Sequence, residues 1–99
     1  MMVSSKLHNE WERDALLQLK QYRGQAEGKV ILSCEFYHKD LRKRDLDNEL
    51  STIQDVLVKA GLLLSDDCFT VEETHAIFGG IDKNNPRVII IIEEIEGEL

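Results

Sequence analysis

The sequence predicts a small α+β domain in which a mixed sheet packs against two helices. Two segments repeat apolar residues at helical spacing, and three others are rich in β-branched and aromatic residues with turn residues around them. The 99 residues, of which 42% are hydrophobic and 31% charged, suit one globular core. We therefore expect a single domain over residues 1–99 with the order helix, strand, helix, strand, strand.

The first predicted helix covers about residues 7–22. Its apolar stripe recurs at spacings of four and three residues: Leu7, Trp11, Ala15, Leu19 and Tyr22. Charged residues lie mostly between these positions, and Gly24 follows as a stop signal. We expect Trp11 to anchor the core rather than to bind a ligand. The next segment, residues 30–37, is β-prone and apolar on both faces, which is typical of a central strand.

The second predicted helix begins at Asp47 or Asn48, because both residue types are good N-caps. Acidic residues early in this helix also suit the positive end of the helix dipole. Gly61 follows the last apolar residue of the helix as a natural terminator. The expected buried stripe consists of Leu50, Ile53, Leu57 and Ala60.

Two further strands are predicted near the C-terminus, over residues 69–78 and 87–95. The loop between them is rich in glycine, asparagine and aspartate, which tight turns favour. The two strands could therefore pair as a long hairpin. Residues 89–92 are apolar on both faces, which fits a strand that lies between helices and a partner subunit.

The charge balance is acidic, with 12 basic and 19 acidic residues and a net charge of −7. This argues against a protein that binds nucleic acid over its whole surface. Residues 39–44 nevertheless contain four basic side chains and one acidic one, and such a local excess can bind phosphate. No apolar run is long enough to span a membrane, and the N-terminus lacks the apolar stretch of a signal peptide. We expect the chain to stay in the cytoplasm, where it is made, and to bind no membrane.

The cysteines and histidines show no ligand pattern. Cys34 and Cys68 lie far apart, with neither CxxC nor Cys/His spacing, so we interpret both as reduced core thiols. The three histidines have no ligand spacing to one another, and solvated or core positions are expected for His8, His38 and His75.

The residues that carry chemistry follow the basic stretch. Asp45 and Asp47 lie two apart, so in an extended segment both carboxylates point to one side just before the second helix. Converging carboxylates repel each other and favour a divalent cation between them, and hard oxygen ligands suit Mg²⁺ or Mn²⁺. A second pair, Asp66 and Asp67, follows the helix, and whether it reaches the first pair is open. The alternatives are that residues 45–48 form only a helix cap and that the second pair is an ordinary turn.

Carboxylates that hold a divalent ion beside arginine and lysine suit the hydrolysis of phosphodiesters, because the ion activates water while the cations position backbone phosphates. The stretch RKRDLDNELSTIQDVLVKAGLLLSDD resembles the centre of the RusA family of Holliday junction resolvases. The matching positions are Arg42, Arg44, Asp45, Asp47, Asn48, Asp55, Lys59, Ala60, Gly61, Asp66 and Asp67. The resemblance extends over about residues 6–95, since the strand before this stretch and the apolar strand after the Asn-Pro-Arg turn also agree.

The resemblance implies a Mg²⁺-dependent endodeoxyribonuclease, encoded by a bacterium or prophage, that acts as a homodimer in DNA recombination and repair. Such an enzyme binds a four-way junction and hydrolyses phosphodiesters symmetrically in two strands. The resemblance implies that Asp45, Asp47 and Asp67 are the catalytic metal ligands and that Asp66 supports them. It gives Asp55 a supporting part in the acidic cluster or in the helix. It assigns contacts with DNA phosphates to Lys39, Arg42, Lys43 and Arg44.

The chain departs from the family pattern in two ways. Ser51 stands where the family usually has a lysine, three residues after Asn48, and serine cannot neutralise charge that develops at a phosphate. The chain also starts almost at its first helix, so we expect it to lack the family's N-terminal strand. These departures leave open a catalytically impaired relative that binds branched DNA or a protein partner. A small acidic dimer whose aspartates are only caps and turns is less favoured, because clustered carboxylates repel one another.

Overall fold

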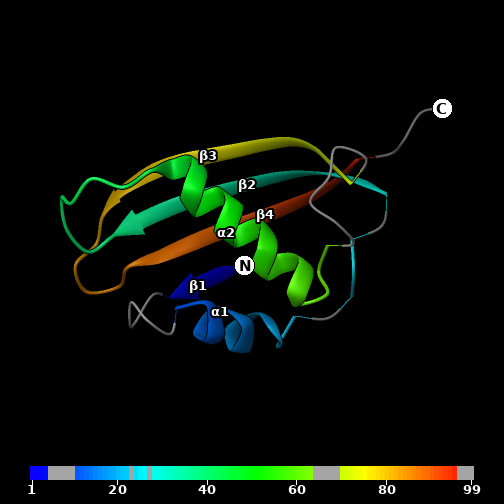
Figure 1. Ribbon diagram of the computed structural model, residues 1–99, viewed down its shortest axis with the longest axis horizontal. Helices are drawn as coiled ribbons and strands as arrows, with labels where there is room; N and C mark the ends of the chain where they lie inside the picture. The colour runs from blue at the N-terminus through cyan, green and yellow to red at the C-terminus, as the bar shows by residue number, and fades with distance from the viewer. Residues whose placement is uncertain (5–10, 23, 27, 64–69, 96–99) are drawn as a thin grey trace.

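The computed structural model confirms a small α+β fold with a four-stranded mixed sheet and two helices (Figure 1). It describes residues 1–4, 11–22, 24–26, 28–63 and 70–95. The elements are β1 (Met2–Ser4), α1 (Trp11–Leu19), β2 (Lys29–His38), α2 (Leu46–Lys59), β3 (Val71–Ile81) and β4 (Arg87–Ile95). Within these ranges, neither helix has the length and apolar character that crossing a membrane would need.

The sheet has the strand order β1-β4-β2-β3, with β2 parallel to β3 and antiparallel to β4. The expected hairpin of the last two strands is therefore wrong, because β3 and β4 pair with opposite edges of β2. Cys34 of β2 shows this directly, since it is opposite Ala76 of β3 and Ile90 of β4. The connection from β3 crosses the end of β2, where the backbone N–H of Asp82 donates to the carbonyl of His38 at 2.7 Å.

The predicted element order also has to be extended by β1, which pairs with β4 at the edge of the sheet. Val3 lies opposite Val88 and is almost fully buried, with 1% of its surface exposed. The N-terminal amine of Met1 donates to the carbonyl of Ile90 at 2.7 Å. A strand of three residues is too short for apolar alternation to reveal it in the sequence.

One face of the sheet carries the core. Figure 1 shows α1 and α2 on the same side of the strands, and the buried residues of β2 alternate toward that side. The core cluster joins Leu32 and Phe36 of β2 to Ala15 of α1 and Ile53 of α2. Ile90 is buried in this cluster, which confirms the helix-facing half of the interpretation of residues 89–92. Their contact with a partner subunit stays a prediction.

Helix α1 lies within the segment that the periodicity indicated, and α2 begins one residue before the predicted segment. Leu19 and Ala15 of α1 are buried, as expected, while the side chain of Trp11 lies outside the described part of the chain. Gly61 follows α2 with a φ of +80°, which confirms its terminating role. Cys34 is a buried free thiol, and burial raises its pKa to about 12, so it is an unreactive core residue. Cys68 lies outside the described residues.

Gly79 of β3 packs against the ring of Tyr37 on β2, and we expect Gly79→Ala to destabilise the fold. A Cβ at this position would lie 2.7 Å from Cζ of Tyr37. The ring is held in place, because its hydroxyl donates to Glu35 and the guanidinium carbon of Arg87 lies 3.9 Å from its centroid. The expected loss is about 1–3 kcal/mol in the free energy of unfolding, measured by urea denaturation.

The control for this prediction is the same substitution in a Tyr37→Ala background. Without the ring there is no clash, so Gly79→Ala should cost much less there. An equal cost in both backgrounds would show that contact with Tyr37 is not the reason for the glycine.

Candidate functional site

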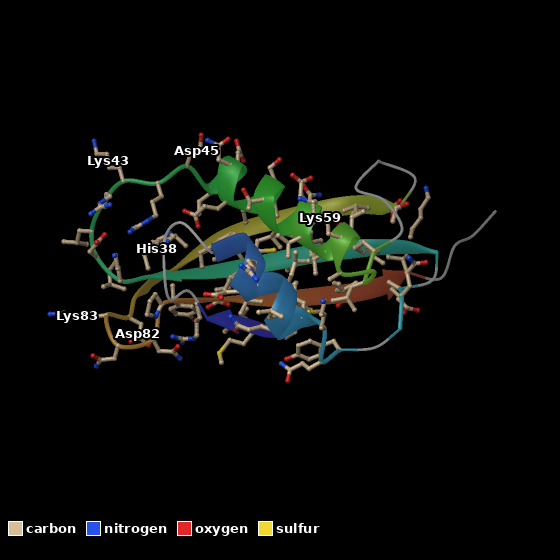
Figure 2. The ribbon with its side chains drawn as sticks, turned by 60° about the horizontal axis from the view of Figure 1, so that its bottom comes forward. His38, Lys43, Asp45, Lys59, Asp82 and Lys83 are labelled. Atoms are coloured by element: carbon tan, nitrogen blue, oxygen red, sulfur yellow. The ribbon has the colours of Figure 1, made fainter. Side chains whose placement is uncertain are left out.

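Two loops meet at one end of the sheet, which we call the loop end. Residues 39–45 connect β2 to α2, and residues 82–86 connect β3 to β4. Figure 2 shows Lys43, Asp45, Asp82 and Lys83 at this end, with Lys59 near the opposite end of α2. The bond from Asp82 to the carbonyl at the end of β2 joins the two loops.

Asp45 is the N-cap of α2, and its Oδ1 accepts a hydrogen bond from the backbone N–H of Asp47 at 2.9 Å. The prediction of Asp47 or Asn48 as the N-cap is therefore wrong by two or three residues. Only Asp45 has extended backbone angles, and Asp47 already belongs to the first helical turn. Both side chains are exposed and lie in the first turn at the positive end of the helix dipole, but the shared face expected of an extended segment is lost, because residues two apart in a helix do not face each other.

A half-buried contact lies between the start of α2 and the end of β2. Nε2 of His38 lies 3.2 Å from Oε1 of Glu49 in the first turns of α2, and the imidazole stacks between the rings of Phe36 and Phe78. Burial lowers the pKa of His38 and raises that of Glu49, since each loses water that would solvate its charged form. The two side chains thus lie between the end of β2 and the helix end that carries Asp45. Sequence reasoning left a solvated or a core position open for His38 and did not identify this role of Glu49.

The segment before Asp45 is closed by an internal ion pair, and we call residues 40–44 the clamped turn. Oδ1 of Asp40 accepts from the backbone N–H of Arg42 at 3.0 Å and from Nη2 of Arg44 at 2.9 Å. Nη1 of Arg44 donates to the carbonyl of Arg42 at 3.0 Å. These hydrogen bonds, from the Arg42 backbone first and then from Arg44, hold the pKa of Asp40 below its usual value.

The clamped turn separates the predicted DNA-binding cations into two kinds. The guanidinium of Arg44 faces the turn, and its side chain is only 20% exposed. Lys39, Arg42 and Lys43 are exposed. Asp40 was missed as a structural residue, although its spacing of four residues from Arg44 is one that ion pairs commonly use.

The second loop is also built around an aspartate. Oδ1 of Asp82 accepts from the backbone N–H groups of Asn84 and Asn85 at 3.2 and 3.1 Å, and its Oδ2 lies 2.7 Å from Nη1 of Arg87. The bond from Arg87 is the main reason that the pKa of Asp82 is lowered. The loop leaves Lys83 exposed at the loop end, and no sequence pattern groups this cation with residues 39–44.

The charges of the chain are therefore unevenly distributed. Exposed cations at the loop end are Lys39, Arg42, Lys43 and Lys83. At the other end of the sheet, β3 begins and β4 ends with exposed glutamates at positions 72, 73, 93 and 94, together with Lys29 and Lys59. The net charge of −7 thus conceals a local surface that can bind phosphate.

The other predicted acids do not join Asp45 and Asp47 in the described part of the chain. Asp55 is exposed, but it lies about 12 Å further along α2 than Asp47, at 1.5 Å per residue. Asp66 and Asp67 lie outside the described residues. Among the residues that are described, no three histidine, cysteine, aspartate or glutamate side chains form a group that could hold a metal ion. Two exposed carboxylates still fit Mg²⁺, which proteins commonly bind through one or two carboxylates with water and a substrate phosphate.

Comparison with known proteins supplies the family. No protein-family model matches the chain. The crossover junction endodeoxyribonuclease RusA of Aquifex aeolicus (strain VF5) is 32% identical over 88 residues, which span 87% of this chain and 68% of that protein. This chain belongs to the RusA family. The membership confirms the resemblance drawn from residues 42–67, and RusA-family membership supports a nuclease.

Proposed function

We propose that this RusA-family protein is a metal-dependent endodeoxyribonuclease that resolves four-way DNA junctions by symmetric phosphodiester hydrolysis. The observation that carries the proposal is that Asp45 and Asp47, exposed at the start of α2, follow the exposed cations Arg42 and Lys43 within one loop, in a chain related to a crossover junction endodeoxyribonuclease. A nuclease needs both groups at one place, because cations hold the backbone while carboxylates hold the ion at the bond to be broken.

The residues of the loop end divide this work. Lys39, Arg42 and Lys43 would bind the phosphates that flank the scissile bond. Asp45 and Asp47 would hold Mg²⁺ or Mn²⁺, which when bound supplies an activated water and offsets charge on the phosphate. The cap bond keeps Oδ1 of Asp45 against the Asp47 N–H and so fixes the orientation of that carboxylate. The proposal keeps Asp55 as a supporting acid of α2 and Arg44 as a phosphate contact, as the family resemblance implied.

A homodimer is part of the proposal, because two coordinated cuts in a two-fold substrate call for two equivalent sites. Leu63 and Thr70, which flank the second acidic pair, lie away from the loop end. The N–H of Leu63 donates to the carbonyl of Leu57 at 3.3 Å, and Val30 at the start of β2 donates to Thr70 at 2.9 Å. Asp45 lies at the other end of a helix about 21 Å long. The described residues Leu63 and Asp45 therefore lie at opposite ends of α2.

The second candidate is a catalytically impaired protein that binds branched DNA or a protein partner. It is favoured by Ser51, which is exposed on α2 one turn after Asp47 and replaces the cation that the family usually has. An impaired protein that binds branched DNA would differ from the nuclease in cleavage and not in binding, so one gel can separate the two.

The test is incubation of the purified chain with a labelled four-way junction in Mg²⁺, in Mn²⁺ and in neither. For the proposed nuclease we expect a protein–junction complex of lower gel mobility without metal, and cut strands when metal is present. A shifted complex that stays uncut in both metals would support the impaired protein. Absence of a complex under all conditions would contradict the nuclease and the binding of branched DNA by an impaired relative.

Lys43→Ala is expected to weaken junction binding without preference for sequence and to reduce the salt dependence of the affinity. Each phosphate contact that is lost lowers the slope of log K against log salt concentration by about 1. Lys29→Ala is the control, because it removes the same charge at the other end of β2. Equal slopes for both variants, measured by fluorescence anisotropy, would contradict the placement of DNA at the loop end.

A further inference from the structure

Leu41 is exposed to an unusual degree. In the described residues no other large hydrophobic side chain is as exposed: the value is 87% for Leu41 and 60% for Leu17. Single apolar residues on a surface are common, so exposure alone would indicate nothing. What distinguishes Leu41 is its position as the second residue of the clamped turn, with Lys39 two residues before it and Arg42 and Lys43 directly after it.

The clamped turn holds Leu41 outward. Asp40 and Arg44 bond to each other and to the backbone of Arg42, so the two ends of the turn face inward and the three residues between them face water. The turn is thereby fixed without any contribution from the leucine side chain. The fold therefore does not explain why position 41 is apolar, and contact with a ligand would explain it.

The neighbours of Leu41 indicate the chemistry of that ligand. Lys39, Arg42 and Lys43 are exposed around it, and Asp45 follows within four residues. A surface that combines an apolar centre with flanking cations matches a nucleic acid whose bases are accessible between two phosphate backbones. Proteins that kink DNA use leucine and similar side chains in this way, inserting them between base steps.

We propose that Leu41 is a wedge that inserts against the bases at the branch point of a four-way junction while the adjacent cations hold the phosphates. The inference rests on the proposed function and extends it to the choice of substrate. At the branch point each strand changes its partner, so a base step can be opened there at less cost than inside a continuous duplex. The wedge therefore favours junction over duplex DNA.

The experiment compares Leu41→Ala with the wild type on a four-way junction and on a duplex of the same sequence. The wedge predicts that the junction Kd rises about tenfold while the duplex Kd changes less than about twofold. With 2-aminopurine at the branch point, binding of the wild type increases the fluorescence by unstacking the base, and binding of Leu41→Ala does not. Leu41→Met, which keeps a long apolar side chain, restores both effects.

Two control variants make the test decisive. Leu17→Ala, which removes another exposed leucine, should leave both affinities unchanged. Lys43→Ala should weaken junction and duplex binding equally. A junction preference that survives Leu41→Ala overturns the wedge but leaves the proposed function standing. A change of oligomeric state in Leu41→Ala also overturns the wedge, because it would place Leu41 between two copies of the chain. A wild-type chain with no junction preference overturns the proposed function as well.

Discussion

Asp45→Asn is expected to remove nicking of a four-way junction while the fold and junction binding are retained. Asparagine caps a helix about as well as aspartate, so the bond to the Asp47 N–H can persist. The negative charge that would hold the metal ion is lost, and the nicking rate should fall by about 10²- to 10³-fold, as when another electrostatic group is removed at a transition state. Junction affinity should stay the same or increase, because one charge that repels phosphate is gone.

Two further variants separate the cap from the chemistry. Asp45→Ala loses both functions and should reduce the free energy of unfolding by about 1 kcal/mol, which Asp45→Asn should not. Glu94→Gln makes the equivalent change at the far end of the sheet and should leave nicking unchanged. Nicking by Asp45→Asn at the wild-type rate would mean that Asp45 is only a cap.

Asp47→Asn should likewise abolish nicking in Mg²⁺ with junction binding unchanged or stronger. The structure sharpens this expectation, because Asp47 takes part in the cap through its backbone N–H, which the substitution does not alter.

Ser51→Lys is expected to increase the nicking rate, by up to about 10²-fold if the missing cation limits the reaction. Ser51 lies four residues after Asp47, so a lysine there would lie on the same side of α2 as that carboxylate. The measurement is the single-turnover rate at saturating protein, which is independent of any gain in affinity.

Thr52→Lys is the matched control, since it adds the same charge one position away on another side of the helix. Equal increases for both variants would indicate a general effect of charge. An unchanged rate for Ser51→Lys would indicate that another residue already supplies the cation.

Local patterns predicted most of the elements. The apolar stripes predicted both helices, and the apolar residues on both faces of β2 predicted its central position in the sheet. Each of these signals depends on near neighbours in the sequence. The pairing of β3 was not predicted, since apolar alternation does not say which edge of β2 a strand will take. β1 was missed because three residues are too few for a pattern.

The candidate site was predicted in part for the same reason. Asp45 and Asp47 are neighbours in the sequence and are neighbours in the structure, although through a helix cap and not through an extended segment. Lys83 joins the loop end only because the loop after β3 crosses the end of β2. The inward position of Arg44 depends on Asp40, and a run of basic residues does not reveal which of them has an internal partner.

The most direct test of the proposed function is to map the cut positions on all four strands of a labelled junction after incubation with the wild-type chain in Mg²⁺. The proposal predicts two nicks, at symmetric positions in opposite strands, and an intact duplex control of the same sequence. Cuts in the duplex at the same rate, or a junction that is bound but uncut in both Mg²⁺ and Mn²⁺, would contradict it.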